Sequence, residues 1–404
     1  MRSSAISKHL GIVLAGGLLA SLGATAGAQE AISFSACLAG IQQQARNEDL
    51  PPWIVDELIP GLEQQPRVLE LDRQQPEFVK TFGQYLSGRV TQTRIDRGRD
   101  LFAEHRAFLD TLTRDYGVPG RYLVAFWGLE TNFGSYLGAT PTLDALATLA
   151  CDQRRSEFFT SELLTALKLV DRDGLQPDTL KGSWAGAYGH TQFMPSTYAR
   201  YALDGDGDGR IDLRGSPRDA LASGANFLSN LGWQPGTRWG REVKLPEGFD
   251  YMQAGLGNPR TVNRWAAMGI TRADGRPLPR ANLEGAILVP AGAGGPAFLV
   301  YRNFHVIMGW NRSEYYAISV GHLADRIGGA GGLRQPPPPD QQALSRDDVK
   351  ALQLGLEARG FPVGQADGIM GPATRTALSQ FQSSAGLVPD GFPDAETRRR
   401  LGSK

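Results

Sequence analysis

The sequence has little of several features that particular functions require. Only two cysteines occur among its 404 residues, and its five histidines form no close pair of the kind that holds a catalytic zinc ion. Lys and Arg together number 42, as do Asp and Glu, so no net charge favours a nucleic acid or an anionic membrane as the partner. These shortages argue against a zinc peptidase or amidase, a cysteine peptidase and a nucleic-acid-binding protein. Specificity must come from a local site.

Long apolar runs are also scarce. The run from Ile12 to Leu22 is glycine-rich and shorter than the roughly 20 residues that span a bilayer. Arg2 and Lys8 precede it, and Ala26-Gly27-Ala28 follows it as a small-x-small cleavage site. This order predicts a signal peptide over residues 1–28, with a membrane anchor as the alternative. We expect an exported protein of the Gram-negative periplasm, soluble and without a membrane span in its mature form.

If the protein is exported, its two cysteines can form a disulfide. An exported chain meets oxidising conditions, under which Cys37 and Cys151 can join. A disulfide also needs two Cα atoms within bonding reach, and the sequence does not show that distance. A disulfide and two separately buried thiols therefore stay open as alternatives.

The pattern of apolar residues changes along the chain. Amphipathic stretches such as Leu101 to Tyr116 predict a mainly helical region from 34 to about 230. Between about 241 and 308, short β-rich runs separated by glycine predict a small antiparallel sheet, and a helical pattern returns at Ser313 to Ile327. The sequence therefore predicts an α+β fold that is mainly α, with a small antiparallel β subdomain.

A proline-rich segment marks a boundary near the end of the chain. Residues 334–343 contain four consecutive prolines, which predict a stiff, extended linker between residues 29–333 and a tail of residues 344–404. Within the tail, Asp367-Gly368 and Asp390-Gly391 are each followed, after the same seven-residue step, by Thr-Arg. This weak repeat resembles the small three-helix peptidoglycan-binding domain of many wall enzymes. A helical module for some other partner is the alternative.

Glu130 is the leading candidate for a catalytic group. The segment from Pro119 to Gly134 predicts a helix in which Leu123, Phe126 and Trp127 precede Glu130 by seven, four and three residues. A carboxyl group on that apolar face loses hydration, which favours the protonated form that a general acid needs. The same placement is compatible with an ordinary structural glutamate.

Residues 181–198 combine three glycines with several aromatic side chains. Glycine permits close backbone approach to a ligand, and flat apolar faces beside a neutral hydrogen-bonding group suit sugar rings. The segment therefore predicts a glycan groove. Its candidate contact residues are Trp184, Tyr188, Gln192 and Phe193.

Two segments, Trp127 to Gly134 and Gly189 to Pro195, closely resemble the B family of lytic murein transglycosylases, and the similarity extends over about 34–327. The resemblance implies a lysozyme-like helical catalytic domain over 29–333 with Glu130 as its single catalytic residue. It also implies a substrate groove and a basic pair near the peptide-bearing sugar. The positions that align with these features are Tyr85, Arg154, Arg155, Ser183, Gln192, Phe193, Asn311 and Tyr316.

The resemblance also implies a reaction. Glu130 protonates the oxygen between N-acetylmuramic acid and N-acetylglucosamine, and then takes a proton from the 6-hydroxyl group, which closes a 1,6-anhydro ring. Neither a cofactor nor a second carboxylate is required. The partners expected are peptidoglycan glycan strands and, as further candidates, other cell-wall enzymes. The alternatives are a hydrolytic muramidase and a non-catalytic wall-binding scaffold. With the linker as a tether, we expect the tail to act as a second binding site for the wall.

An acidic loop matches the first nine positions of an EF-hand loop from Asp204 onward, with carboxylates at one, three and five, glycine at six and a backbone carbonyl at seven. Position twelve, where a bidentate glutamate is typical, holds Gly215. In the resembled family a later aspartate closes the site. We therefore predict a structural calcium site, with a solvated acidic turn as the alternative. Its ligands are Asp204, Asp206, Asp208, Arg210 and Asp219.

Overall fold

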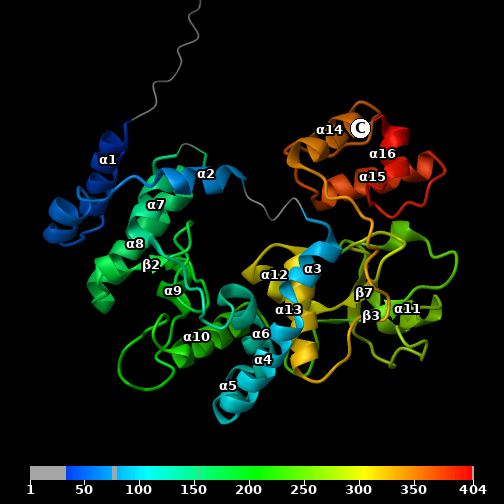
Figure 1. Ribbon diagram of the computed structural model, residues 1–404, viewed down its shortest axis with the longest axis horizontal. Coiled ribbons are helices and arrows are strands. Elements are labelled where there is room, and N and C mark those ends of the chain that lie inside the picture. The colour runs from blue at the N-terminus through cyan, green and yellow to red at the C-terminus, as the bar shows by residue number, and fades with distance from the viewer. Residues whose placement is uncertain (1–32, 75–79, 153, 403–404) are drawn as a thin grey trace, which may run out of the picture.

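The computed structural model describes residues 33–74, 80–152 and 154–402 (Figure 1). The predicted signal peptide, residues 1–28, lies outside these described residues. Within the described ranges, no helix is both long enough and apolar enough to cross a bilayer.

An N-terminal lobe, on the left of Figure 1, is built around the apolar helices α7 and α8. Its core contains Leu146, Leu163 and Leu167, each fully buried. Helix α1 covers α8, and the chain leaves this lobe and later returns to it. The helices of the lobe are α1 (Phe34–Asn47), the π-helix Ile54–Leu58, α2 (Pro66–Gln74), α7 (Thr142–Ala150), α8 (Ser156–Asp173) and the short α9 (Pro195–Tyr201).

A central helical body surrounds α6 (Gly120–Thr131). This helix is apolar on nearly every face, so it is stable only when other helices cover it. Helix α13 (Glu314–Ile327) runs against it, and both contribute to one large apolar core. The other helices of the body are α3 (Phe82–Arg89), α4 (Gln92–Glu104), α5 (Arg106–Tyr116), α10 (Pro217–Asn230) and α12 (Arg302–Trp310).

The β subdomain is a five-stranded antiparallel sheet in the order β4-β6-β7-β3-β5. Val300 pairs with Ala286 on one side and with Gly240 on the other. The expected fold class, mainly α with a small antiparallel sheet, is confirmed. The strands are β3 (Gly240–Lys244), β4 (Arg260–Thr261), β5 (Thr271–Arg272), β6 (Glu284–Leu288) and β7 (Ala297–Val300), and the subdomain adds α11 (Val262–Ala267) and the 3-10 helix η4 (Tyr251–Gln253). A separate pair, β1 (Thr140–Pro141) and β2 (Lys181–Gly182), lies near the N-terminal lobe; β1 precedes α7, and β2 follows the 3-10 helix η3 (Pro177–Thr179).

The C-terminal domain has three helices: α14 (Arg346–Glu357), α15 (Pro372–Ser384) and α16 (Ala395–Leu401). The sequence repeat has a structural basis, because each copy holds one buried glutamine. In the first copy, Gln353 donates to the Asp367 carboxylate and the Thr374 hydroxyl, and accepts from the Gly368 backbone N–H. In the second copy, Gln382 makes the same set of bonds to Asp390, Thr397 and Gly391.

The linker is held against the sheet rather than free of it. The backbone N–H groups of Arg334 and Gln335 both donate to Glu242 on β3, and the Gln341 side chain donates to the Ala291 carbonyl at 2.7 Å. These contacts fix both ends of the predicted linker to the β subdomain in this structure. Figure 1 accordingly shows the C-terminal domain beside the sheet and α3.

A disulfide joins Cys37 in α1 to Cys151, the residue that caps α7, with 5.8 Å between the two Cα atoms. The alternative of two separate thiols is therefore excluded in this structure. The bridge links positions 114 residues apart and fixes the start of the lobe to its central helix.

Replacing both Cys37 and Cys151 with serine should lower the free energy of unfolding by about 2 to 4 kcal/mol, because the bridge restricts the unfolded chain over a long loop. Urea unfolding followed by circular dichroism measures this loss. A reducing agent should reproduce it in the wild type and leave the double variant unchanged. Equal midpoints for the oxidised wild type and the variant would contradict a stabilising role.

Candidate active site

Glu130 lies in the last turn of α6 and is partly exposed, whereas Leu123, Phe126 and Trp127 before it are buried. The hydroxyl of Tyr316, on the facing helix α13, donates a hydrogen bond to its Oε1 atom. Burial, together with the nearby Glu130 charge, raises the pKa of Tyr316 well above its ordinary value. The hydroxyl therefore stays protonated and acts as a permanent donor to the carboxylate.

Helix α3 supplies a second pair of side chains to this region. Tyr85 is buried, and the Arg89 guanidinium lies over its ring at 5.4 Å from the centroid. Both residues are electrostatic neighbours of the Tyr316 hydroxyl, and Arg89 opposes the rise in its pKa. Tyr85 was predicted to contact substrate, whereas Arg89 was not predicted. The signal was present, since Arg89 follows Tyr85 by four residues on the same helical face.

Residues 183–194 dock onto the end of α6 through His190. The Trp127 indole N–H donates to His190 Nδ1 at 2.9 Å, and the Thr131 hydroxyl donates to the His190 carbonyl at 3.2 Å. Burial lowers the pKa of His190, so the imidazole stays neutral and can accept this bond. Gln192 is held nearby, because its amide donates to the Gly189 carbonyl at 2.9 Å. The predicted groove segment and the predicted acid therefore lie together.

Unusual backbone conformations gather at this junction. Among the described residues, only four non-glycine positions have left-handed backbone, and three of them are Asn132, Phe133 and Gln192. Gly134 is also left-handed, and a Cβ atom there would lie 2.2 Å from His190 Cε1. The motif after Glu130 therefore ends in glycine because the imidazole occupies the space of a side chain. Such strain collects at functional sites, where the surrounding structure fixes it.

Other predicted contact residues differ in accessibility. Tyr188 and Asn311 are partly exposed, and burial together with the Asp212 charge raises the pKa of Tyr188 to about 12. The Ser183 hydroxyl accepts two backbone N–H groups of its own loop, which fixes the turn. Phe193 is only 2% exposed and packs 5.3 Å from the Trp310 ring. It therefore supports the groove from behind and offers no open face to a sugar.

The predicted basic pair lies in the other lobe. Arg154 and Arg155 both form ion pairs with Asp72 of α2, whose side chain is 3% exposed, while the two arginine side chains remain 49% and 43% exposed. Asp72 was not predicted, because its partners are more than 80 positions away. The buried carboxylate holds both guanidinium groups in place with their outer faces open to solvent.

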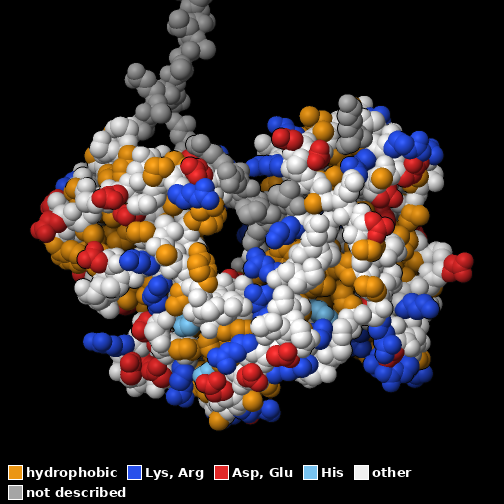
Figure 2. Space-filling model, viewed as in Figure 1, with side chains coloured by type: hydrophobic (Ala, Val, Ile, Leu, Met, Phe, Trp, Pro, Cys, Tyr) orange, Lys and Arg blue, Asp and Glu red, His pale blue; other side chains and the backbone are white. Residues whose placement is uncertain are grey.

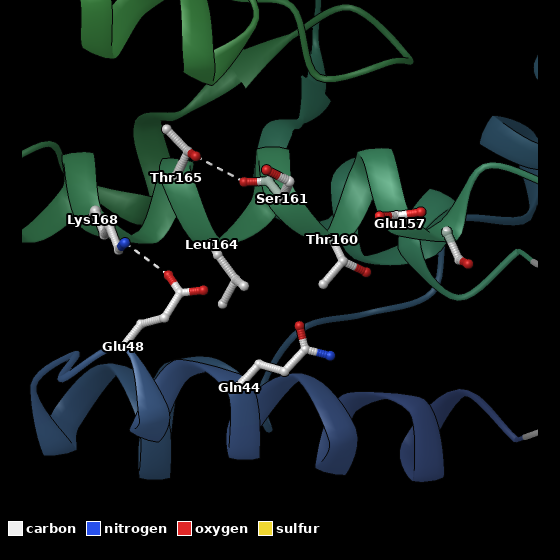
Figure 3. Close-up of a pocket in the computed structure, with 9 residues that line it drawn as sticks. Gln44, Glu48, Glu157, Thr160, Ser161, Leu164, Thr165 and Lys168 are labelled. Atoms are coloured by element: carbon white, nitrogen blue, oxygen red, sulfur yellow. Dashed lines mark hydrogen bonds and ion pairs between the residues drawn. The ribbon is translucent and has the colours of Figure 1, made fainter.

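The region around Glu130 does not coincide with the cavity between α1 and α8. A polar cavity of about 520 Å³ lies between α1 and α8, where Lys168 pairs with Glu48 at 2.7 Å (Figure 3). None of the predicted site residues lines it. Figure 2 instead shows the molecule hollowed between the N-terminal lobe and the rest of the chain. The site is thus identified by its residues and their contacts.

The acidic loop brings three carboxylates together. Oxygen atoms of Asp204, Asp206 and Asp219 all lie within 4.8 Å of one another, and Asp219 is only 1% exposed. This separation fits oxygen ligands at about 2.3 to 2.6 Å around one calcium ion. The Asp208 carboxylate lies outside this group and accepts the Arg210 backbone N–H at 2.8 Å. The three remaining carboxylates converge on one point and offer the oxygen atoms that a hard cation prefers.

The loop also connects directly to the groove. The Leu213 carbonyl, which follows the acidic segment, accepts the His190 backbone N–H at 2.8 Å. The Ser216 hydroxyl, which was not predicted to belong to the site, lies within hydrogen-bond distance of both Asp206 and Asp219 and donates to them. The acidic loop therefore anchors the segment that carries Gln192.

Comparisons with known proteins agree with this geometry. The model of the peptidoglycan binding domain matches residues 345–401. The structure of SltB3 from Pseudomonas aeruginosa in complex with NAG-anhNAM-pentapeptide is 40% identical, covers 92% of this chain and 99% of that chain, and has a TM-score of 0.88. Escherichia coli Slt35 in complex with calcium is 30% identical, covers 73% of this chain and 93% of that chain, and has a TM-score of 0.64.

A curated relative points the same way. Membrane-bound lytic murein transglycosylase B of Escherichia coli is 34% identical over 244 residues, which are 59% of this chain. The matched region spans 65% of that relative's length. The model of the transglycosylase SLT domain matches residues 33–325, from α1 to the last turn of α13. The chain therefore belongs to the transglycosylase SLT family.

Proposed function

We propose that this protein is a lytic transglycosylase that cleaves the β-1,4 bond between N-acetylmuramic acid and N-acetylglucosamine in peptidoglycan and leaves 1,6-anhydromuramic ends. The observation that carries this proposal is the position of Glu130, partly exposed at the end of a buried helix and bound by the protonated Tyr316 hydroxyl. The relative SltB3 was solved with an anhydro-sugar peptide, the class of product that such a reaction leaves.

The geometry supports one residue acting first as acid and then as base. Protonated Glu130 gives its proton to the glycosidic oxygen, and the bond from that oxygen to C1 of the muramic residue breaks. The 2-acetamido group of the substrate stabilises the cation that develops at C1. Ionised Glu130 then takes the proton of the 6-hydroxyl group, and O6 bonds to C1. No water is consumed, and the acid is restored.

Tyr316 binds the carboxyl group that acts in both steps. When Glu130 has lost its proton, the Tyr316 hydroxyl donates to the resulting carboxylate and stabilises it. The bond also fixes the orientation of Glu130 before substrate binds, which shortens the search for a reactive geometry. A muramidase built on the same acid would place water at C1 and release a reducing end, so the product distinguishes the two reactions.

We also propose a structural calcium ion at the acidic loop. Asp204, Asp206 and Asp219 would hold it with their carboxylates, and the EF-hand pattern adds the backbone carbonyl of Arg210. The relative Slt35 was solved in complex with calcium. Bound there, calcium would offset two of the three carboxylate charges and stiffen the loop whose Leu213 carbonyl holds His190.

The domain organisation completes the proposal. Residues 1–28 would direct export to the periplasm and be removed. Residues 29–333 would form the catalytic domain, 334–343 the linker and 344–404 the peptidoglycan-binding domain. The partner would be the glycan strand itself, and other cell-wall enzymes could recruit the protein. This arrangement suits turnover or remodelling of the wall.

Glu130→Gln should abolish turnover while binding to insoluble sacculi survives, because the amide keeps the shape but cannot transfer the proton. General acid-base catalysis is worth roughly 10²- to 10⁴-fold, and one group acting twice should put the loss at or above the upper value. Release of soluble fragments from sacculi measures turnover. Glu247→Gln, at an exposed glutamate of the β subdomain, is the matched control and should behave as the wild type.

Mass spectrometry of the products tests the reaction type in the same samples. Anhydro ends are lighter by one water than reducing ends. Reducing ends from the wild type would keep Glu130 as the acid and overturn the transglycosylase reaction, whereas normal turnover in Glu130→Gln would remove Glu130 from the mechanism.

Calcium should raise the melting temperature of the full-length protein by about 5 to 10 °C at a hundredfold excess over its dissociation constant, since the ion binds only the folded state. The double variant Asp204→Asn, Asp206→Asn should lose this rise. Asp250→Asn, a helix-capping aspartate of the β subdomain, should keep it. Identical melting curves of the wild type in calcium and in chelator would exclude a metal site at this loop.

A further inference from the structure

A second polar cavity, of about 540 Å³, lies on the β subdomain and is lined by residues from 238–242, 272–276 and 331–334. Five arginines line it against two carboxylates, so the cavity is basic although the whole chain has no net charge. Figure 2 shows Lys and Arg side chains gathered at the lower right, over the β subdomain. We call this site the arginine cavity, and its charged residues are Arg238, Arg241, Glu242, Arg272, Asp274, Arg276 and Arg334.

The arginine cavity is separate from the candidate active site. Arg238 binds Asp325 in the last turn of α13 at 2.9 Å, whereas Tyr316 lies in the first turn of that helix. Nine residues at about 1.5 Å each put roughly 14 Å of helix between these two levels. The backbone N–H of the residue after Arg238 donates to the hydroxyl of Tyr122, near the start of α6. The cavity therefore lies at the ends of α6 and α13 that are far from Glu130.

One carboxylate is shared by two arginines of the cavity. Asp274 lies 3.5 Å from Arg272 and also forms an ion pair with Arg276, which follows the same strand. The side chains of these arginines remain 44% and 68% exposed. Because a guanidinium group has five N–H donors, each of them keeps donors for a ligand.

The arginines on the β3 side of the cavity are less well compensated. The Nε–H groups of Arg238 and Arg241 are buried and have no acceptor in the part of the chain that the structure describes. The Glu242 carboxylate is occupied by the backbone N–H groups of residues 334 and 335, which carry no charge. Even when Asp325 is counted with the lining carboxylates, the five arginines exceed them by two charges. An anionic ligand would supply the missing charge.

The arrangement of the arginines favours a ligand with several carboxylates. Arg238 pairs with Asp325, whereas Arg272 and Arg276 pair with Asp274, so the cations form separate groups around the cavity. Separate cations suit a chain of spaced carboxylates better than one compact phosphate. A peptide stem of peptidoglycan is such a chain, because it ends in a free carboxylate and contains acidic residues. The volume also lies within the roughly 300 to 1,000 Å³ that is typical of ligand sites.

We propose that the arginine cavity is a second recognition site, which binds the carboxylates of peptidoglycan peptide stems away from the bond that is cleaved. This inference takes its substrate class from the function proposed above. The C-terminal domain is seated on the same subdomain: Asp390 Oδ2 accepts the Ala293 backbone N–H at 2.8 Å, and a Cβ atom at Gly292 would lie 2.9 Å from Phe392 Cβ. The β subdomain then joins two wall-binding elements, its own arginine cavity and the domain seated on it.

Isothermal titration calorimetry of the full-length protein with a free stem pentapeptide tests the inference, because it measures binding without cleavage. The double variant Arg241→Ala, Arg334→Ala should weaken binding by about tenfold or more, since a hydrogen bond to a charged group is worth at least this factor. It keeps the backbone N–H at position 334 that binds Glu242. Lysine at both positions should recover part of the loss, because it keeps the charge but lacks the planar fork. Arg280→Ala, at an exposed arginine of the same subdomain outside the cavity, should match the wild type.

Two further probes identify the ligand. A pentapeptide with an amidated C-terminus should bind the wild type more weakly, because it lacks one carboxylate. Inorganic phosphate should bind more weakly still, and an affinity equal to that of the pentapeptide would overturn the assignment to peptide stems.

The same titrations show whether the cavity is the site. No binding of the pentapeptide to the wild type, or unchanged affinity in the double alanine variant, would overturn the inference. So would binding that is lost only in Arg154→Ala, Arg155→Ala, because the peptide would then lie in the other lobe. Should the double variant unfold below the assay temperature, Arg276→Ala provides the second measurement, and normal binding there also contradicts the inference. A wild type that binds the pentapeptide but does not cleave sacculi would count against the proposed function alone.

Discussion

The proposed active site depends on one hydrogen bond, which joins the side chains of two packed helices. Helix α6 is apolar on nearly every face and carries Glu130 in its last turn, and α13 brings Tyr316 to that carboxyl group. Neither helix could expose its apolar faces to water, so their packing is fixed by the core before any substrate arrives. Because the apolar core holds the two helices in place, the hydrogen bond between Tyr316 and Glu130 has a fixed geometry.

Local signals in the sequence were sufficient for much of the fold. The apolar pattern predicted a helix around Glu130 at 119–134, and the structure has it at Gly120–Thr131. The β-rich runs became β6 and β7, and the Asp-Gly repeat became two equal copies of one polar core. In each case the pattern and the contacts that explain it are close together in the sequence.

Contacts between distant segments were not predictable in the same way. Asp72, which holds Arg154 and Arg155, carries no local mark of its role, and neither does His190 beneath Gly134. Phe193 was predicted to contact sugar because it is aromatic and lies beside Gln192. Its burial follows from the ring of Trp310, more than one hundred residues later in the chain. Tertiary packing decides which face of an aromatic side chain remains open.

The two copies of the C-terminal domain have unequal freedom to change during evolution. The surface of the second copy faces the loop at Gly292, so a substitution at Asp390 or Phe392 must be matched by one in the catalytic part. The first copy has the same buried glutamine core, but its Arg346 faces solvent. An exposed residue of the first copy such as Arg346 can therefore change without a matching change in the catalytic part. Within fewer than sixty residues, one copy of the repeat therefore has an exposed surface and the other contacts the catalytic part.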